Sequence, residues 1–412
     1  MGKRIIGVIL LAALFVSLFG CGKEKEKNPS VTVTPTDAIT ASATPTGTPT
    51  GTPTPSPVPV NPLDSMTLRE RYKDSFKVGV ALPNSIISIP RYTDIVKEEF
   101  SSFTFENEMK PDALLDKAAT QNGYPDTNTE PVLRFTSLKR GLDFAQENGI
   151  RLRGHTLLWY KQTPKWFFTV DYREGSELCS REVMIARLES YIRQVMEYFQ
   201  TEYPGLIYAW DVVNEAVDGQ TGDENMIRKG SNLWYSTIGP DFIQYAFRFA
   251  RKYSDGTAKL YYNDFNCAQK KFGIVKVLEP ILAEGNIDGI GMQCHLSSGN
   301  SVREDVYKTA KYFASQGYCI EITELDIGQT LKGEDGDKIQ AMKYKILFQL
   351  MEEAKKNGEI DIDSITVWGL YDTVSWRATE RPLLYRIAVG GLEKKPAWYG
   401  AMQDPDIPAM EW

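Results

Sequence analysis

Ile-Tyr-Ala-Trp-Asp-Val-Val-Asn-Glu (Ile207–Glu215) is a nearly continuous apolar run that ends in two polar residues. Such a run predicts a strand that is buried on both faces, as strands of parallel sheets are. A second run of this kind, Cys319–Ile327, carries Glu324 close to its end. The two glutamates therefore sit at the carboxyl ends of predicted strands, where a buried carboxylate is costly unless it has a partner or a function.

Working outward from Ile207–Glu215, eight short β-rich runs recur along the chain, and helical spacing fills most of the intervals between them. The predicted strands are Phe76–Leu82, Ser102–Asn107, Arg151–Trp159, Ile207–Glu215, Lys259–Asn266, Ile287–Leu296, Cys319–Ile327 and Ser364–Asp372. The clearest predicted helices are Thr136–Asn148, Arg181–Gln200, Asp241–Tyr253, Lys270–Ala283, Val302–Gln316 and Lys338–Lys356.

This alternation predicts an α/β fold with parallel strands and right-handed crossovers. Eight units in one domain fit a (β/α)8 TIM barrel. The competing fold is an open, doubly wound sheet. No Gly-x-Gly-x-x-Gly turn follows the first predicted strand, which weighs against a dinucleotide-binding version of that alternative.

The N-terminal region predicts a targeting signal and a linker rather than part of the folded domain. Residues 1–20 join a Lys-Arg pair to an uncharged apolar stretch and end in Leu-Phe-Gly before Cys21, which indicates a lipoprotein signal peptide with Cys21 as the lipidated residue. The rival interpretation is an uncleaved anchor, but the apolar run is shorter than the roughly 20 residues that span a bilayer. Residues 21–62 are rich in Thr and Pro and predict an extended linker. Residues 63–412 form the predicted catalytic domain, lipid-anchored to the cell membrane and extracellular.

Composition narrows the partners of the protein. The chain has 412 residues and a net charge of −7, which argues against a nucleic-acid partner or an anionic lipid surface. We therefore expect membrane contact through the N-terminal lipid only, and a monomer. Aromatic residues make up 11% of the chain, which fits either a sugar-binding site or an aromatic-rich core. Cys179, Cys267, Cys294 and Cys319 allow disulfides after export, but three of them lie on or beside predicted strands, which favours free thiols.

Polar residues gather at the predicted strand ends, as expected for the active-site rim of a barrel. Around them lie six motifs, in the order Glu-Asn-Glu-Met-Lys-Pro (106–111), Arg-Gly-His-Thr-Leu-Leu-Trp (153–159), Trp-Asp-Val-Val-Asn-Glu-Ala (210–216), Gly-Met-Gln-Cys-His-Leu (291–296), Ile-Thr-Glu-Leu-Asp (322–326) and Val-Trp-Gly-Leu-Tyr-Asp (367–372). These motifs closely resemble those of glycoside hydrolase family 10, the endo-1,4-β-xylanases, and the resemblance extends from about Leu68 to the C-terminus.

The resemblance implies that Glu215 is the general acid/base and Glu324 the nucleophile of a retaining hydrolase that cleaves internal bonds of xylan. Residue chemistry agrees, because cleavage of a glycosidic bond needs one protonated and one ionised carboxyl group. The structural alternative is that either glutamate is an ion-pair partner, for example of Arg153 or Lys110. The surrounding motifs favour the catalytic interpretation.

The resemblance also implies substrate-binding roles for residues at the rim. Asn214 would donate to the sugar 2-hydroxyl, and His295 would hydrogen-bond the nucleophile. Eleven residues are expected to bind xylan or xylo-oligosaccharides: Glu106, Asn107, Lys110, His155, Trp159, Gln162, Asn214, Gln293, His295, Trp368 and Trp376. Asp264 and Asp326 would orient their neighbours. The two histidines lack a recognisable ligand spacing, so we expect no metal and no cofactor.

Two positions depart from the family pattern. Tyr160 stands where most relatives carry a histidine and is followed by Lys161, and Phe265 stands where a tyrosine is usual. We expect activity to be retained with altered subsite preference. The alternatives are a non-catalytic sugar-binding lipoprotein, which intact Glu215 and Glu324 disfavour, and another β-1,4 specificity such as cellulose. One hydroxymethyl group separates xylose from glucose, and a pocket resolves such a difference by only about 1–3 kcal/mol.

Overall fold

The computed structural model describes residues 61–219 and 226–410. The chain divides into two units, Met1–Val58 and Pro59–Trp412, and every described residue belongs to the second. The predicted signal peptide, the lipidated Cys21 and nearly all of the predicted linker lie outside the described residues.

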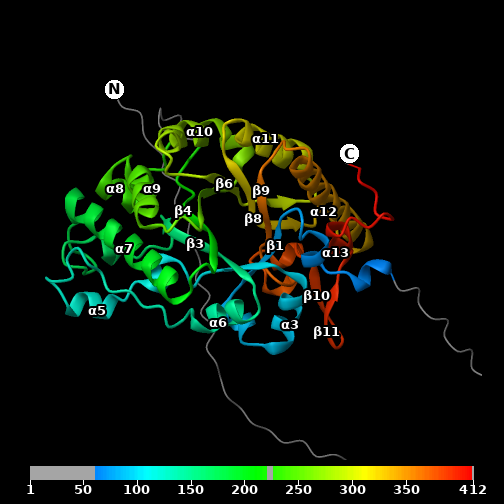
Figure 1. Ribbon diagram of the computed structural model, residues 1–412, viewed down its shortest axis with the longest axis horizontal. Coiled ribbons are helices and arrows are strands. Elements are labelled where there is room, and N and C mark those ends of the chain that lie inside the picture. The colour runs from blue at the N-terminus through cyan, green and yellow to red at the C-terminus, as the bar shows by residue number, and fades with distance from the viewer. Residues whose placement is uncertain (1–60, 220–225, 411–412) are drawn as a thin grey trace, which may run out of the picture. The chain divides into compact units, whose positions relative to one another are not determined.

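Parallel strands close into a ring, and Figure 1 shows helices on all sides of these strands. Neighbouring strands pair in the order β6-β5-β4-β3-β2-β1-β9-β8, and β6 also pairs with β8, which leaves no open edge in the ring. These strands are β1 (Lys77–Leu82), β2 (Ser102–Phe105), β3 (Arg151–Trp159), β4 (Ile207–Asn214), β5 (Lys259–Asp264), β6 (Gly289–Met292), β8 (Cys319–Gly328) and β9 (Ile362–Val367). The predicted (β/α)8 barrel is confirmed.

Helices follow the strands and pack around the ring (Figure 1). The α-helices are α1 (Leu68–Arg71), α2 (Asn84–Ile87), α3 (Pro90–Glu99), α4 (Pro111–Leu114), α5 (Lys117–Asn122), α6 (Lys139–Glu147), α7 (Arg181–Glu202), α8 (Leu233–Ile238), α9 (Phe242–Tyr253), α10 (Cys267–Ala283), α11 (Lys308–Ser315), α12 (Gly333–Lys356) and α13 (Pro396–Ala401). Side-chain caps start α1, α5, α7 and α8. The hydroxyl of Ser180, for example, caps α7 by accepting from Val183 N.

Burial explains why the strands read as apolar runs. Every residue of β4 is buried, and the same holds for β2 and β6. Because all strands of the ring run in parallel, their carboxyl ends meet at one rim. The polar residues that end these strands are therefore brought together there.

One predicted strand is divided in the structure. The run Ile287–Leu296 forms β6 and then a separate short strand, β7 (His295–Ser297), which pairs with β8 beyond the ring. The break occurs because Cys294 adopts a left-handed backbone conformation with φ of +58°. The turn brings Gln293 and His295 to the rim rather than into the barrel wall.

Smaller differences concern the ends of elements. The predicted helix Val302–Gln316 begins as a π-helical turn, η3 (Val302–Tyr307), and continues as α11. The last strand of the ring ends at Val367, so Trp368 already lies in the loop that follows. That loop contains 3-10 turns and an antiparallel hairpin, β10 (Tyr385–Ala388) and β11 (Gly391–Lys394), which the sequence pattern did not predict.

A charged cluster fills part of the barrel interior. Arg153 donates through both terminal nitrogens to Asp211 and through Nε to Glu321 Oε2 at 2.5 Å, and all three side chains are fully buried. Removing one partner of a buried pair of this kind costs about 3–5 kcal/mol, because it leaves an uncompensated charge. Arg153 therefore has carboxylate partners of its own and is not the ion-pair partner of Glu215 or Glu324.

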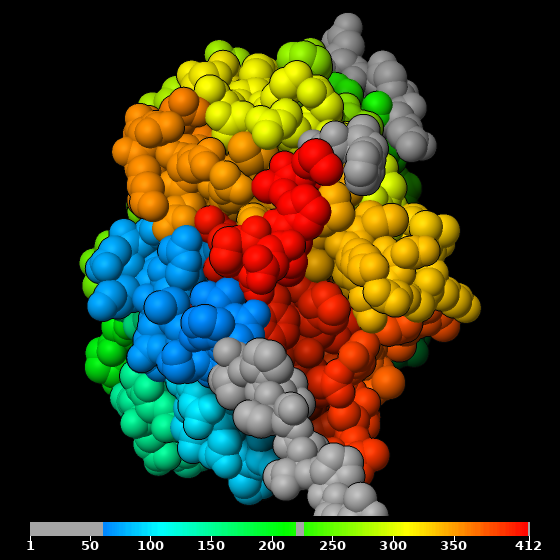
Figure 2. Space-filling model, turned by 90° about the vertical axis from the view of Figure 1, so that its right-hand side faces the viewer, coloured from blue at the N-terminus to red at the C-terminus, as the bar shows by residue number. Residues whose placement is uncertain are grey.

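The two ends of the described chain pack together. In Figure 2 the C-terminal residues (red) lie between the first described residues (blue) and α12 (orange). Tyr72 donates its hydroxyl to Ala401 O, and the Asn61 amide donates to Asp404 at 2.7 Å. Among the described residues, no helix combines the length and apolar character that a membrane span requires.

Candidate active site

One cavity of about 460 Å³ at the carboxyl-end rim collects the residues predicted for catalysis and substrate binding. It is lined by Glu106, Asn107, Lys110, His155, Trp159, Gln162, Asn214, Glu215, Gln293, His295, Glu324, Trp368 and Trp376. The lining also includes Lys161, Phe265 and Asn266, which were not among the predicted site residues. Strand ends from β2 around to β9 contribute these side chains, so the cavity is the mouth of the barrel.

Glu324 is hydrogen-bonded through both carboxylate oxygens. Oε1 accepts from Asn263 Nδ2 at 2.7 Å, and Oε2 accepts from His295 Nε2 at 3.1 Å. Burial by itself raises the pKa of this carboxyl, but the His295 hydrogen bond and the charges of His155, His295 and Lys110 outweigh it and lower the pKa to about 2. Glu324 is therefore an ionised group at neutral pH.

His295 lies between two carboxylates. Its Nδ1 is 2.9 Å from Asp326 Oδ2, and its Nε2 faces Glu324. Burial alone would lower the pKa of this imidazole, but the two carboxylates raise it to about 10. Both ring nitrogens consequently donate, as only the protonated ring can. Asp326 is fixed in turn by Trp376 Nε1 at 3.0 Å and by Arg377, which fits the orienting role predicted for it.

Glu215 has different surroundings. Its Oε1 accepts from Gln293 Nε2 at 3.1 Å, whereas its buried Oε2 has no hydrogen-bond donor among the described residues. The nearest cation to Oε2 is the exposed Lys161, whose Nζ lies 3.9 Å away. The backbone of Glu215 is left-handed, with φ of +56°. This conformation costs a residue other than glycine about 1–3 kcal/mol, and such strain concentrates at functional sites.

A chain of amide side chains connects the two glutamates. Asn263 Nδ2 donates both to Glu324 Oε1 and to Asn214 Oδ1, the latter at 2.9 Å. Gln293 Nε2 bridges Asn214 Oδ1, at 3.3 Å, and Glu215. Because Asn214 Oδ1 accepts both bonds, its NH2 group is the part that can donate to a ligand. Asn263 lies in the predicted strand Lys259–Asn266 but was not among the predicted site residues, and its polar side chain near the end of that strand is the signal that could have identified it.

Polar groups from β2 and β3 line the far end of the cavity. Lys110 Nζ donates to Asn107 Oδ1 at 3.1 Å, and Gln162 Nε2 lies 3.4 Å from the same oxygen. Burial lowers the pKa of Lys110 and raises the pKa of Glu106, although each is partly offset by the charge of the other. His155 donates from Nδ1 to Asp211 Oδ2 at 2.8 Å, which turns its Nε2 away from the barrel interior.

Three tryptophans form the walls of the cavity. Trp368 meets the His155 ring edge-on at 5.4 Å between ring centroids, and Trp376 meets the His295 ring similarly at 5.0 Å. Trp376 is 63% exposed, unusually high for so large an apolar side chain. Trp159 carries an indole N–H that is buried without an acceptor among the described residues. The exposed ring of Trp376 suits a ligand that has C–H faces.

The two departures from the family pattern have structural counterparts. Tyr160 packs against the guanidinium of Arg228, 4.7 Å from the ring centroid. Lys270 Nζ lies 3.5 Å from the centroid of the Phe265 ring, and it also pairs with Asp264 Oδ1 at 2.8 Å. Asp264 does not line the cavity, but its carboxylate accepts from Tyr262 Oη at 2.6 Å and from Phe265 N at 2.9 Å, and the orienting role expected of it stays a prediction.

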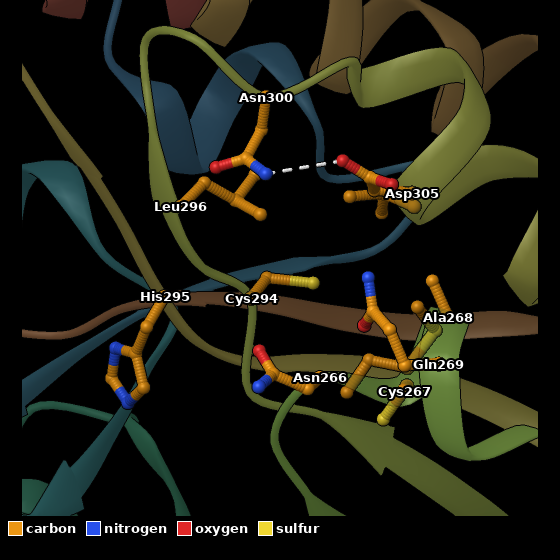
Figure 3. Close-up of a pocket in the computed structure, with 11 residues that line it drawn as sticks. Asn266, Cys267, Ala268, Gln269, Cys294, His295, Leu296, Asn300 and Asp305 are labelled. Atoms are coloured by element: carbon orange, nitrogen blue, oxygen red, sulfur yellow. Dashed lines mark hydrogen bonds between the residues drawn. The ribbon is translucent and has the colours of Figure 1, made fainter. Parts of the chain in front are cut away.

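A smaller cavity of about 120 Å³ lies behind β7 (Figure 3). Figure 3 shows the Cys294 thiol on its inner side and the His295 ring turned to the other side of the chain. Asn300 and Asp305, which are hydrogen-bonded at 3.1 Å, form one wall, and Gln269 lies in the opposite wall. The cysteines of the described chain, Cys179, Cys267, Cys294 and Cys319, are free thiols.

Comparison with known proteins identifies relatives over most of the described chain. The model of Glycosyl hydrolase family 10 matches residues 67–404. Endo-1,4-beta-xylanase B of Butyrivibrio fibrisolvens is 40% identical over 346 residues, which cover 82% of this chain and 53% of the relative. Endo-1,4-beta-xylanase A of Thermotoga maritima is 40% identical over 329 residues, or 77% of this chain and 29% of the relative. The chain thus spans about half of the first relative and under a third of the second.

Solved structures show the same similarity in three dimensions. The CBM22-1–GH10 modules of a Clostridium thermocellum endo-1,4-beta-D-xylanase, complexed with xylohexaose, superpose with a TM-score of 0.75 at 33% identity, covering 84% of this chain and 68% of that one. A Glu→Ala mutant of an intracellular xylanase from Thermoanaerobacterium saccharolyticum, complexed with xylotetraose, has a TM-score of 0.70 at 31% identity. That match covers 82% of this chain and 98% of the other.

Proposed function

The chain belongs to glycosyl hydrolase family 10, and from that premise we propose that it is a retaining endo-1,4-β-xylanase that hydrolyses internal bonds of xylan. The observation that carries the proposal is the unequal pair of carboxyl groups in one cavity. Glu324 has both oxygens hydrogen-bonded and is held ionised, whereas Glu215 keeps one oxygen without a donor. This is the division of labour that a retaining glycosidase requires.

In the first step Glu324 attacks the anomeric carbon, and the bond from that carbon to the glycosidic oxygen breaks. The proton of Glu215 passes from Oε2 to the departing oxygen, since Oε2 has no protein donor to displace. The product is a glycosyl ester of Glu324. The positive charge of His295 offsets the charge of Glu324 before the attack and remains beside Asp326 afterwards.

In the second step Glu215, now a carboxylate, takes a proton from a water molecule. The water oxygen bonds to the anomeric carbon from the face that the aglycone left, and the ester bond to Glu324 breaks. Two displacements on opposite faces restore the original configuration. Both glutamates return to their starting protonation states.

The remaining lining residues would bind the sugar chain. We assign Asn214, His155 and Gln293 to the sugar that is attacked, and Glu106, Asn107 and Lys110 to the next sugar toward the non-reducing end. Charge-assisted hydrogen bonds from such groups to hydroxyls are stronger than neutral ones. The rings of Trp159, Trp368 and Trp376 would contact the sugar rings by their faces or edges. Gln162 would donate a further hydrogen bond to a sugar hydroxyl.

Initial rates on xylan and on carboxymethylcellulose test this function, with Glu324→Ala as the control for contaminating activity. We expect cleavage of xylan, much slower cleavage of the cellulose derivative, and no activity from the variant. A purified wild-type protein that cleaves neither xylan nor xylo-oligosaccharides contradicts the proposal. NMR of the first-formed reducing-end anomer tests retention independently, with the β-anomer expected.

The location of the enzyme is a separate proposal. A lipid on Cys21 and the Thr/Pro-rich residues up to about Pro62 would tether a monomeric catalytic domain to the cell membrane, on its outer side. Mass spectrometry of the membrane-associated protein is expected to find acyl chains on Cys21. Recovery of protein with an intact Met1 from membrane fractions would contradict the lipoprotein interpretation.

A further inference from the structure

Arg228 connects the strained backbone of Glu215 to Tyr160, one of the two departures from the family pattern. Its Nε donates to the carbonyl oxygen of Glu215 at 3.1 Å, and its guanidinium lies 4.7 Å from the centroid of the Tyr160 ring. The side chain of Arg228 is only 16% exposed, so the contact is largely shielded from water. A histidine side chain at position 160 would present a smaller ring to that guanidinium.

The backbone of Arg228 also holds the segment that follows β4. Arg228 N donates to Ala216 O at 2.7 Å, so Arg228 holds two consecutive carbonyl groups, one through its backbone and one through its side chain. Val217 N donates to Tyr262 Oη at 2.8 Å on the other side. The peptide groups that leave the end of β4 are thereby fixed on both sides of the left-handed residue.

We propose that Arg228, braced by the Tyr160 ring, is a positioning residue for the catalytic acid. By holding the Glu215 carbonyl it keeps the left-handed turn that directs the Glu215 side chain into the cavity, where Gln293 holds only one of its two oxygens. A displacement of about 1 Å in a catalytic group can cost on the order of a hundredfold in rate. The inference rests on the proposed function, since it concerns only the steps in which Glu215 gives or takes a proton.

The dependence of the rate on the leaving group tests this role. Departure of phenol requires proton donation from Glu215, whereas departure of a dinitrophenolate does not. The parameter kcat/KM includes only the steps up to departure of the aglycone. We would compare phenyl and dinitrophenyl β-xylobiosides as substrates of the wild type, Arg228→Met and Arg228→Lys. All three proteins are produced from the full-length sequence. The two substrates are assayed on one preparation, so any loss of folded enzyme cancels in their ratio.

Arg248→Met serves as the matched control. Arg248 is a half-exposed arginine on α9 that pairs with Glu284 at 2.6 Å and is not among the residues that line the cavity. Its replacement removes the same functional group from the surface of the same protein, and kcat/KM on both xylobiosides is expected to match the wild type.

For Arg228→Met we expect kcat/KM on the phenyl substrate to fall by at least about tenfold and on the dinitrophenyl substrate by less than about twofold. Arg228→Lys retains the charge but not the planar stack on Tyr160. Its kcat/KM on the phenyl substrate is therefore expected to lie between that of the wild type and that of Arg228→Met. Equal losses on both substrates, or no loss on either, would overturn the positioning role while leaving the xylanase assignment intact. A wild type that hydrolyses neither xylobioside would overturn the proposed function and this inference together.

Discussion

Glu215 and Glu324 are both buried at the ends of two strands of one barrel, and each accepts from an amide side chain through Oε1, yet the surroundings of their Oε2 atoms and of their backbones differ. Glu324 continues a regular strand, accepts two hydrogen bonds and faces an imidazolium ring. Glu215 sits just past the end of β4 in a left-handed conformation, with one oxygen bonded and one without a donor. The difference indicates that the neighbours of each carboxyl group, rather than the residue type, would set the two roles that we propose.

The comparison also shows how the two groups are kept apart in function while they share one cavity. The amides of Asn263, Asn214 and Gln293 run between them and carry no charge. The charged partner, His295, contacts only Glu324 of the two. The positive charge that stabilises ionised Glu324 is thereby confined to that carboxylate.

The largest effect is expected when Glu324, which has both carboxylate oxygens hydrogen-bonded, is replaced. Glu324→Ala eliminates the proposed nucleophile and should lower kcat on xylan by on the order of 10⁴-fold to 10⁶-fold, as loss of a covalent nucleophile does elsewhere. Assays of initial rate measure the loss, and circular dichroism verifies the fold. Residual activity within about a hundredfold of the wild type would mean that Glu324 is not the nucleophile.

Removal of the other member should have a smaller and more selective effect. Glu215→Ala is expected to lose about 10²-fold to 10⁴-fold on xylan, the range typical of general acid–base catalysis. The kcat/KM on dinitrophenyl β-xylobioside should change far less, because that leaving group needs no proton. Azide should raise kcat of the variant and give a β-xylobiosyl azide, since an anion needs no general base. A uniform loss on all substrates would contradict the acid/base assignment.

Replacement of His295, the charged neighbour of Glu324, should make Glu324 harder to ionise. His295→Asn removes the donor and positive charge that counter the effect of burial on Glu324, so the pKa of Glu324 should rise from about 2 toward or above 4.5. The acidic limb of kcat/KM against pH is then expected to move upward by at least about one unit, with about a tenfold loss at neutral pH. An acidic limb that stays in place would separate His295 from the ionisation of Glu324.

The same variant makes a prediction about stability. The pKa of His295 is raised on folding from 6.5 to about 10, so its stabilising contribution is complete below pH 6.5 and disappears as the pH approaches 10. The melting temperature of the wild type should therefore exceed that of His295→Asn most at the acidic end of this window. The difference is expected to narrow as pH rises, and a difference that widens would contradict the protonated state of His295.

The smallest effect is expected at the wall of the cavity. Trp376→Ala removes an exposed ring that also donates to Asp326. Loss of one aromatic contact of about 0.5–1.5 kcal/mol should raise KM for xylo-oligosaccharides by about twofold to tenfold. A fall in kcat of similar size would indicate that the bond to Asp326 matters more than contact with sugar.

Much of this arrangement could be predicted from sequence because it depends on local patterns. The apolar runs predicted the barrel strands, and the rim follows from parallel pairing, so Glu106 and Trp376 could be expected near each other although far apart in the chain. The division of Ile287–Leu296 could not be predicted, because the left-handed turn at Cys294 is not a preference of that residue. Arg228 was missed for a similar reason. The role that we propose for it arises from contacts with Glu215 and Tyr160, which no spacing in the sequence encodes.

The most direct measurement is to trap the covalent intermediate. A dinitrophenyl xylobioside that carries fluorine in place of the 2-hydroxyl of the attacked sugar should quickly lose dinitrophenolate and form an ester with the enzyme, which should then hydrolyse slowly. Mass spectrometry of the intact protein and of its peptides is expected to find one fluorinated xylobiosyl group, attached to Glu324. Attachment to Glu215, or turnover without any labelled protein, would contradict the assignment of the two carboxyl groups.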